Sequence, residues 1–267
     1  MNDKNNQPII IYGVPNSQPF RAVVWLCLIK QLPFEIKLSF PVYGLSAPSK
    51  PNGDKLPNPR GTIPVMDDNG FILWESHAIM TYLCEKYKWD DYYPTNDIKK
   101  KALINNYLHF HHRNVREIVV KWSRTLWPSV FNKGPNPSER WMNRNTFAGL
   151  RNNDQVVEKS VQIVEEMLSE NIYLTGDKPS IADISCYEEF GQNQEKYANV
   201  YQFNNCPNIQ RWLRLMERLP HHETAHAIYT MIGDANKVSG GMKTIARANK
   251  IATKIIMEYV GSMRSNL

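Results

Sequence analysis

The stretch that decides the fold reads Asn58-Pro59-Arg60-Gly61-Thr62-Ile63-Pro64-Val65-Met66-Asp67-Asp68 and, beyond a turn at Asn69-Gly70, Trp74-Glu75-Ser76-His77-Ala78-Ile79. It predicts a loop, a strand that opens on an Ile-Pro bond, a turn, a second strand, and a helix beginning at Glu75-Ser76. Because only X-Pro bonds adopt the cis form at modest cost, Ile63-Pro64 is a candidate cis peptide. Such a bond exposes the backbone of Ile63 along the strand edge. Ser76 lies where unsatisfied helix N–H groups favour an anion, so the stretch can hold an extended peptide and its carboxylate.

The residues before this stretch add a βαβ unit. Ile9 to Tyr12 predicts a short buried strand, and Gln18 to Gln31 predicts a largely buried helix with Pro19 in its first turn. Phe34 to Phe40 alternates between apolar and polar residues and predicts a second strand. The element order is therefore βαβ followed by ββα, which is an α/β arrangement.

The pattern changes to long helices after residues 88–96. Strand signals disappear, and helical periodicity covers residues 97–127, 138–170, 181–195, 207–218 and 242–260. We therefore expect a first domain at residues 1-88, a linker at 89-96 and an all-helical domain at 97-267. The predicted fold class is α/β plus all-α.

Two helices carry more detailed signals. Ser180 and Asp183 have the spacing of a capping box, with Ser180 as the N-cap. The last helix places apolar residues on one face, and these are Ile245, Ala248, Ala252, Ile255, Ile256, Tyr259 and Met263. That face either packs on the domain surface or covers a substrate pocket, and the sequence leaves both interpretations open.

The composition is that of a globular protein and argues against several other classes. Hydrophobic residues make up 42% of the 267 residues and charged residues 22%. The polar start at residues 1–8 lacks the apolar core of a signal peptide, and the longest apolar run, Ala22 to Ile29, is too short to span a bilayer. The 4 cysteines are widely spaced and form no C-x-x-C pair, so we expect no disulfide framework and a cytoplasmic location without a membrane partner.

The net charge of +6 does not indicate a nucleic-acid partner. Residues 1–96 carry nine Lys/Arg and nine Asp/Glu, so the whole excess lies in the helical part. There the basic residues recur at helical spacing, as on a solvated helix face, without the interleaved aromatic residues of a nucleic-acid surface.

Ser17 is the candidate residue for chemistry. It lies in Pro15-Asn16-Ser17-Gln18-Pro19-Phe20-Arg21, between the first strand and the first helix. A hydroxyl at a helix N-terminus can donate to an anion that the helix dipole also favours. If the anion is a thiolate, stabilisation by roughly 2–3 kcal/mol lowers its pKa by about two units, enough to ionise most of it at neutral pH. The alternative is that Ser17 only caps the helix; a nucleophilic serine is disfavoured because no Gly-x-Ser-x-Gly elbow surrounds it.

These residues resemble the cytosolic glutathione transferases, specifically their theta class, over most of the chain. Ser17-Gln18-Pro19-x-Arg21-Ala22 is similar to the theta active-site motif, and Asn58-Pro59 with Ile63-Pro64 to the glutathione-backbone loop. Glu75-Ser76-x-Ala78-Ile79-x-x-Tyr82-Leu83 resembles the γ-glutamyl site, and Ser180-Ile181-Ala182-Asp183 the capping motif of the helical domain. The resemblance implies a thioredoxin-like domain followed by an all-helical one.

The resemblance also implies site residues and a reaction. Ser17 would stabilise the glutathione thiolate, which attacks a small electrophile, with glutathione as cosubstrate and no metal. Other glutathione contacts would come from Gln18, Thr62, Ile63, Pro64, Glu75, Ser76 and Asn105. Three residues on the first long helix are candidates to face the electrophile, His111, His112 and Arg116, although for Arg116 a solvated helix face is the favoured interpretation.

The sequence departs from the family pattern at the glycine end of glutathione. The loop from Val42 to Leu56 is longer than in animal theta enzymes, and it lacks an assignable histidine for the glycine carboxylate, a role that Lys50 or Lys55 can take. Thr62 replaces a common lysine, and Asn105 replaces an acidic residue that the family often contributes across a dimer.

His222-Glu223-Thr224-Ala225-His226 matches the zinc motif H-E-x-x-H. Tyr229 stands where the extended zinc-protease pattern requires glycine, and no downstream carboxylate has a ligand context. These departures argue against zinc, and the family resemblance implies an ordinary surface helix of the second domain here.

The leading prediction is a theta-like, homodimeric glutathione S-transferase of detoxification that acts on alkyl halides, epoxides or peroxides, with dehalogenase or peroxidase side activity. The rival is a non-catalytic interaction module with the same fold, against which the retention of Ser17, Glu75 and Ser76 argues. A cysteine-type oxidoreductase is excluded because no cysteine lies between Gly13 and Arg21.

Overall fold

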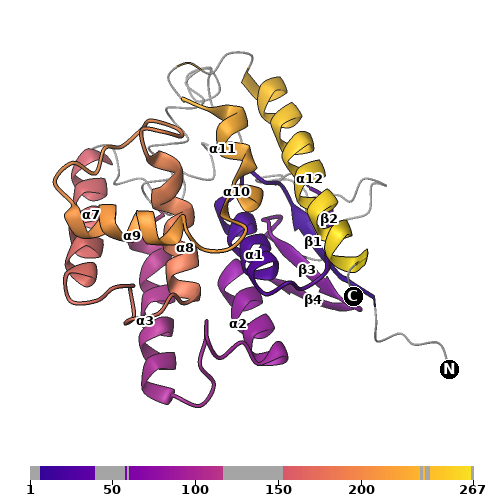
Figure 1. Ribbon diagram of the computed structural model, residues 1–267, viewed down its shortest axis with the longest axis horizontal. Helices are drawn as coiled ribbons and strands as arrows, with labels where there is room; N and C mark the ends of the chain where they lie inside the picture. The colour runs from indigo at the N-terminus through magenta and orange to yellow at the C-terminus, as the bar shows by residue number, and fades with distance from the viewer. Residues whose placement is uncertain are drawn as a thin grey trace.

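The computed structural model describes residues 7–39, 58, 60–116, 153–234, 237 and 241–265. Its N-terminal half is a four-stranded mixed sheet with helices (Figure 1), in the order β1 (Ile9–Gly13), α1 (Gln18–Ile29), β2 (Phe34–Leu38), β3 (Val65–Asp68), β4 (Phe71–Trp74) and α2 (Ser76–Tyr87). The strand order is β2-β1-β3-β4, with β1 parallel to β2 and antiparallel to β3. This confirms the predicted βαβ-ββα order and the thioredoxin-like domain.

The strand registers bring three loops to one edge of the sheet. Gly13 pairs with Leu38, Tyr12 with Val65, and Val65 in turn with Trp74. The end of β1, the start of β3 and the end of β4 are therefore neighbours. The segments that follow β1, precede β3 and follow β4 must all emerge there, and these are the segments of Ser17, Ile63-Pro64 and Glu75-Ser76.

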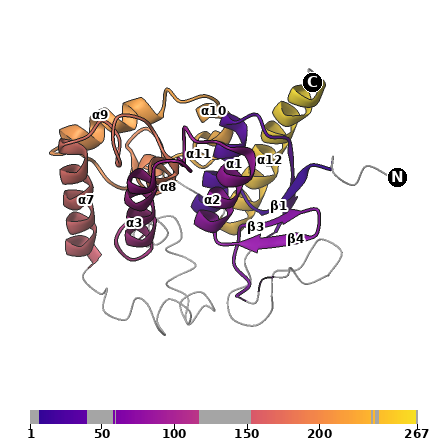
Figure 2. The same cartoon turned by 90° about the horizontal axis from the view of Figure 1, so that it is seen from below.

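Helix α1 is the central element of this half because it is buried on almost every side. Phe20 and Trp25 are fully buried, and α1 packs against both α2 and α8 (Ile181–Phe190), so that it lies between the sheet and the helical half (Figure 2). Gly13 allows α1 to approach the end of β1. It has φ +157°, and a Cβ there would lie 2.3 Å from the Phe20 ring. A larger residue would push α1 away from the sheet.

The described helical half consists of α3 (Ile98–Asn114), α7 (Asn153–Ser169), α8, the 3₁₀ turn η3 (Gly191–Asn193), α9 (Pro207–Met216), α10 (His222–Ala225), α11 (Ala227–Ile232) and α12 (Gly241–Ser265). The helix expected over 181–195 is wrong in its second part, because the α-helix ends at Phe190 and a 3₁₀ turn follows. The helix expected over the H-E-x-x-H segment is present as α10, whereas α11, which is too short to show a helical repeat, was not predicted. Residues 117–152 lie outside the described residues. They include the end of the helix expected at 97–127 and the start of the helix expected at 138–170. No helix in the described part is long and apolar enough to cross a membrane.

The predicted capping box at the start of α8 is confirmed. Ser180 Oγ accepts from the backbone N–H of Ala182 at 3.2 Å, and Asp183 Oδ2 accepts from the N–H of Ser180 at 2.9 Å. The other carboxylate oxygen of Asp183 accepts from the N–H of Leu174 and from Trp212 Nε1. One buried carboxylate therefore joins α8 to α9 and to the preceding turn.

The last helix, α12, returns to the N-terminal half. It packs on α10, α11 and β2 (Figure 1). Arg264 donates to the carbonyl oxygen of Phe34 at 3.2 Å. Its predicted apolar face is confirmed at Ile245, Ala248, Ala252 and Ile256. The prediction is wrong for Ile255, which is 36% exposed. Ile255 lies about 100° from Ile256 around the helix, and it falls at the edge of the buried face.

Candidate active site

Ser17 occupies the N-cap position of α1 but does not use its hydroxyl as a cap. Its φ and ψ are −83° and 119°, its N–H donates to Val14 O at 3.0 Å, and its side chain makes no cap hydrogen bond. The interpretation of Ser17 as only a helix cap is therefore wrong. The hydroxyl is half-buried at the helix N-terminus, where it can donate to a bound anion.

The next residue, Gln18, shares this environment. Its side chain is 6% exposed, and within the described part of the chain its Nε2 has no hydrogen-bond partner. A buried amide that lacks a partner is costly, so a polar ligand at this edge would gain a donor that is already in place.

The Ile63-Pro64 bond is cis, as predicted. The β1–β3 ladder ends at the Tyr12–Val65 pair, so the backbone of Ile63 lies beyond it. Asn58 holds the loop that precedes cis-Pro64. Its Nδ2 donates to the carbonyl oxygen and to Oγ1 of Thr62, at 2.8 and 3.0 Å. Both oxygens of Thr62 therefore have a partner, and the Thr62 side chain serves the loop itself.

Glu75 and Ser76 begin α2 as predicted, with Glu75 as the N-cap and Ser76 as the first helical residue. Ser76 is 6% exposed. Glu75 has φ 72° and ψ 114°, a left-handed conformation unusual for a residue with a side chain, and it makes no cap hydrogen bond. The first N–H groups of α2 therefore remain available to an anion.

A histidine cluster brings α3 to the start of α2. The ring of His77 lies 5.1 Å from that of His111 and 4.7 Å from that of His112. Burial lowers the pKa of His77 and His111 well below the usual value, and burial also lowers the pKa of His112. The rings are therefore neutral at neutral pH. His111 is itself buried beside Tyr107, whereas His112 is exposed.

Arg116 lies close to a buried carboxylate. Its Nη1 and Nε2 of His111 are each 3.6 Å from Oε1 of Glu189 on α8, and the Arg116 side chain is 33% exposed. The Arg116 side chain is thus partly solvated and also meets a buried carboxylate. Burial raises the pKa of Glu189 to about 7, and within the described residues its Oε2 has no hydrogen-bond partner. His112, Arg116 and Glu189 thus form a polar group beside the start of α2.

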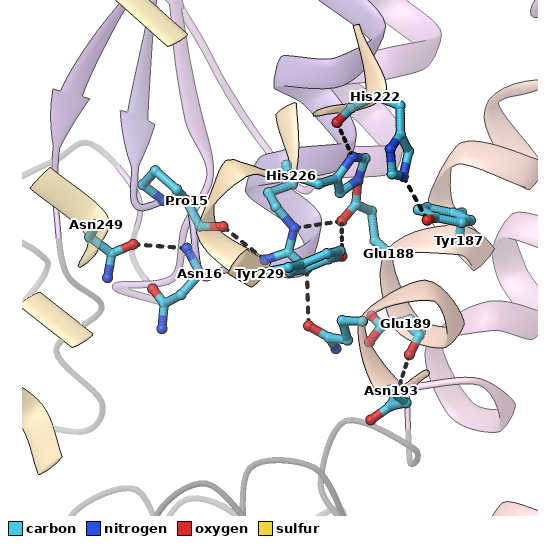
Figure 3. Close-up of polar contacts among 12 residues, drawn as sticks. Pro15, Asn16, Tyr187, Glu188, Glu189, Asn193, His222, His226, Tyr229 and Asn249 are labelled. Carbon is cyan, nitrogen blue, oxygen red and sulfur yellow. Dashed lines mark hydrogen bonds and ion pairs between the residues drawn. The ribbon is translucent and has the colours of Figure 1, made fainter. Parts of the chain in front are cut away.

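Four residues after Ser17, the buried guanidinium of Arg21 joins the two halves, and Figure 3 labels its partners Pro15, Glu188 and Tyr229. Arg21 Nε donates to Glu188 Oε2 at 2.7 Å, Nη1 to Pro15 O at 2.8 Å, and Nη2 to Gln192 Oε1 and to the Tyr229 hydroxyl, both at 3.0 Å. The sequence did not predict this network. The available signals were an arginine within an apolar helix and the pair Glu188-Glu189 within a buried one.

His222 and His226 are buried, so the surface helix expected for the H-E-x-x-H segment is wrong. Nε2 of His222 lies 2.6 Å from the Tyr187 hydroxyl, and Nε2 of His226 lies 2.9 Å from Oε1 of Glu188 (Figure 3). Each ring thus contacts a side chain of α8, and α10 ends at Ala225, between the two histidines. No group of three or more potential metal ligands occurs among the described residues.

Two predicted parts of the site are not seen at this edge of the described structure. Oδ1 of Asn105 accepts from the Tyr93 hydroxyl at 2.9 Å, which joins α3 to the segment before it. The loop from Val42 to Leu56, with Lys50 and Lys55, lies outside the described residues.

Comparison with known proteins identifies the family. The glutathione S-transferase N-terminal domain matches residues 20–86, and the C-terminal domain of the same family matches residues 149–220, together more than half of the chain. The chain belongs to the glutathione S-transferase family. Its theta-class resemblance is confirmed by the chicken glutathione S-transferase theta-1, which is 28% identical over 241 residues, or 84% of this chain and 88% of that protein.

Solved structures of family members share the fold. A glutathione S-transferase of Bombyx mori, described as unclassified 2, is 25% identical, with a TM-score of 0.65 over 86% of this chain and 98% of its own. Human glutathione transferase theta-2, solved in complex with glutathione and an unknown ligand, is 24% identical, with a TM-score of 0.66 over 93% of this chain and 99% of its own.

Proposed function

We propose that this transferase conjugates glutathione to small electrophiles and that Ser17 stabilises the reacting thiolate. The observation that carries the proposal is the convergence of Ser17, Ile63 and Ser76 at one sheet edge, which the strand registers require. An extended tripeptide laid along this edge would meet a hydroxyl, a free backbone group and a helix N-terminus in turn.

In this proposal the protein binds and activates glutathione without forming a covalent bond to it. The Ser17 hydroxyl donates a hydrogen bond to the sulfur, and the N-terminus of α1 adds its partial positive charge. The sulfur lone pair forms the new C–S bond, and the leaving group departs with the electron pair of the bond that breaks. With an epoxide, that pair stays on the ring oxygen, which takes up a proton.

The other glutathione contacts follow from the same edge. The backbone of Ile63 pairs with the cysteinyl residue beside cis-Pro64, and Glu75 and Ser76 hold the γ-glutamyl amine and carboxylate. Gln18 offers its free Nε2. Thr62 supports the loop through Asn58. Asn105 would contribute only across a homodimer.

We assign the electrophile side to His112 and Arg116. Their proximity to the start of α2, through His77, and the 3.6 Å contact of Arg116 with Glu189 support this assignment. A cation there would stabilise an anionic leaving group, which fits alkyl halides, epoxides or peroxides and a role in detoxification.

A homodimer and a cytoplasmic location are also proposals, and both rest on the family resemblance.

The test is the ionisation of bound glutathione, measured by thiolate absorbance across pH, together with turnover of a panel of electrophiles. We expect Ser17→Ala to bind glutathione but to raise its thiol pKa by about two units. Ser17→Thr, which keeps a hydroxyl, should retain much of the effect. Wild-type turnover in Ser17→Ala would contradict the role of Ser17, and no glutathione binding by the wild type would favour the non-catalytic interaction module.

A further inference from the structure

The peptide group that precedes Ser17 is held at both of its ends by buried side chains. The carbonyl oxygen of Pro15 accepts from Nη1 of Arg21 at 2.8 Å, and the N–H of Asn16 donates to Oδ1 of Asn249 at 2.8 Å (Figure 3). These two atoms belong to one peptide unit. Because that unit is planar and its C=O and N–H point in opposite directions, two such bonds fix the orientation of its plane.

Both holding groups are themselves fixed by the helical half. Arg21 is anchored through its 2.7 Å ion pair with Glu188 of α8. Asn249 is fully buried on α12, and its Nδ2 donates to the carbonyl oxygen of Ile245 at 3.0 Å within the same helix. Since the amide nitrogen is occupied by its own helix, the amide oxygen must be the atom that faces Asn16.

We propose that Asn249 is a positioning residue, which fixes the Pro15–Asn16 peptide and through it the Ser17 hydroxyl, so that thiolate stabilisation depends on the docking of α12. The proposal rests on the proposed role of Ser17. Ser17 follows Asn16, one peptide unit further along the chain, so a rotation of the Pro15–Asn16 plane redirects the chain that enters Ser17 and moves the hydroxyl away from the sulfur. Small displacements of a catalytic group are costly, by up to about 100-fold per 1 Å.

The decisive variant is Asn249→Leu, which has a similar volume but cannot accept from the Asn16 N–H. We expect a rise of about one unit in the thiol pKa of bound glutathione, which is a roughly tenfold fall in the ratio of thiolate to thiol, with little change in the KM for glutathione. Asn249→Ala provides a second truncation if the leucine variant does not fold.

Ile256→Ala is the matched control, because Ile256 is equally buried on α12 but contacts neither Asn16 nor Ser17 through a hydrogen bond. It weakens the packing of the helix and leaves the Asn249–Asn16 bond intact. Hydrogen exchange of the Asn16 amide reports the bond directly, and we expect it to accelerate in Asn249→Leu and not in Ile256→Ala. The same thiol pKa in Ile256→Ala and Asn249→Leu would overturn the proposal.

A double variant that combines Asn249→Leu with Ser17→Ala separates the positioning role of Asn249 from the proposed role of Ser17. If Asn249 acts through Ser17, Asn249→Leu adds no further rise in thiol pKa to the Ser17→Ala protein. An unchanged thiol pKa in Asn249→Leu, while Ser17→Ala raises it, would overturn the positioning role and leave the proposed function intact. An unchanged thiol pKa in Ser17→Ala itself would overturn both.

Discussion

At the scale of single residues, the proposed site requires Glu75 to adopt a backbone conformation that a residue with a side chain disfavours. Its φ of 72° and ψ of 114° lie in a region that residues with a Cβ rarely adopt, and such conformations cost about 1–3 kcal/mol. The Glu75 side chain makes no cap hydrogen bond to the start of α2 that would offset this cost. The conformation turns the chain from β4 into α2 and leaves the first N–H groups of that helix open.

We therefore predict that Glu75→Gly increases stability and decreases function. Glycine relieves the strain but loses more entropy on folding, so the free energy of unfolding should rise by a net ~1 kcal/mol in urea denaturation. Glutathione affinity, measured by calorimetry, should fall because the carboxylate is lost. Asn69→Gly, at a φ of 55° in the exposed β3–β4 turn, is the control and should leave the affinity unchanged. A less stable Glu75→Gly protein would contradict the strain argument.

At the scale of elements, α8 carries the contacts that join the two halves, and its capping box fixes its start. Asp183 is fully buried and accepts from the N–H groups of Leu174 and Ser180 and from Trp212 Nε1. Burial raises the pKa of Asp183 despite these donors. If the carboxylate is removed, each of these three donors loses the charged oxygen to which it donates.

Asp183→Ala should therefore cost much more than Ser180→Ala. We expect a loss of about 3–5 kcal/mol for the aspartate, as for other buried charged networks, and about 1 kcal/mol for the serine, as for an ordinary N-cap. Chemical denaturation followed by circular dichroism measures both. Similar losses in the two variants would mean that the role of Asp183 is limited to the helix cap.

At the scale of the whole molecule, several buried histidines make stability depend on pH. Burial lowers the pKa of His222 to about 2, and burial lowers the pKa of His77 and His111 well below the usual 6.5. Below pH 6.5 the unfolded chain therefore binds protons that the folded protein does not. The free energy of unfolding is highest above this pH and falls as the pH decreases from about 6.5 towards the folded pKa values.

Each such histidine should contribute a slope of about 1.4 kcal/mol per pH unit between roughly pH 6 and 4. His222→Gln should reduce this slope by the contribution of one proton, about 1.4 kcal/mol per pH unit. The slope is measured from urea denaturation at a series of pH values. His109→Gln, at an exposed position of α3, should leave the slope unchanged. An unchanged slope in His222→Gln would show that the His222 ring is charged in the folded protein.

The sequence predicted the parts of this molecule that depend on local patterns. The cis Ile63-Pro64 bond, the Ser180–Asp183 box and the start of α2 each follow from a few adjacent residues, and all are confirmed. Arg21 with Glu188, and Asn16 with Asn249, are separated by 167 and 233 residues, so no local pattern reveals them. The buried position of His222 and the contact of Arg116 with Glu189 were missed for the same reason: the partners of both residues lie far away in the sequence, on α8.

The bond between Asn16 and Asn249 also has a consequence for the order of synthesis. The first sheet and α1 leave the ribosome long before α12 exists, and domains generally fold as they emerge. During that interval the Asn16 N–H has no acceptor from α12, so the Ser17 loop is left without its final constraint. In our proposal, a nascent or truncated chain that ends before residue 241 folds its thioredoxin-like sheet but stabilises the thiolate poorly. Activity is then a late event of translation, gained when the last helix returns to the first loop.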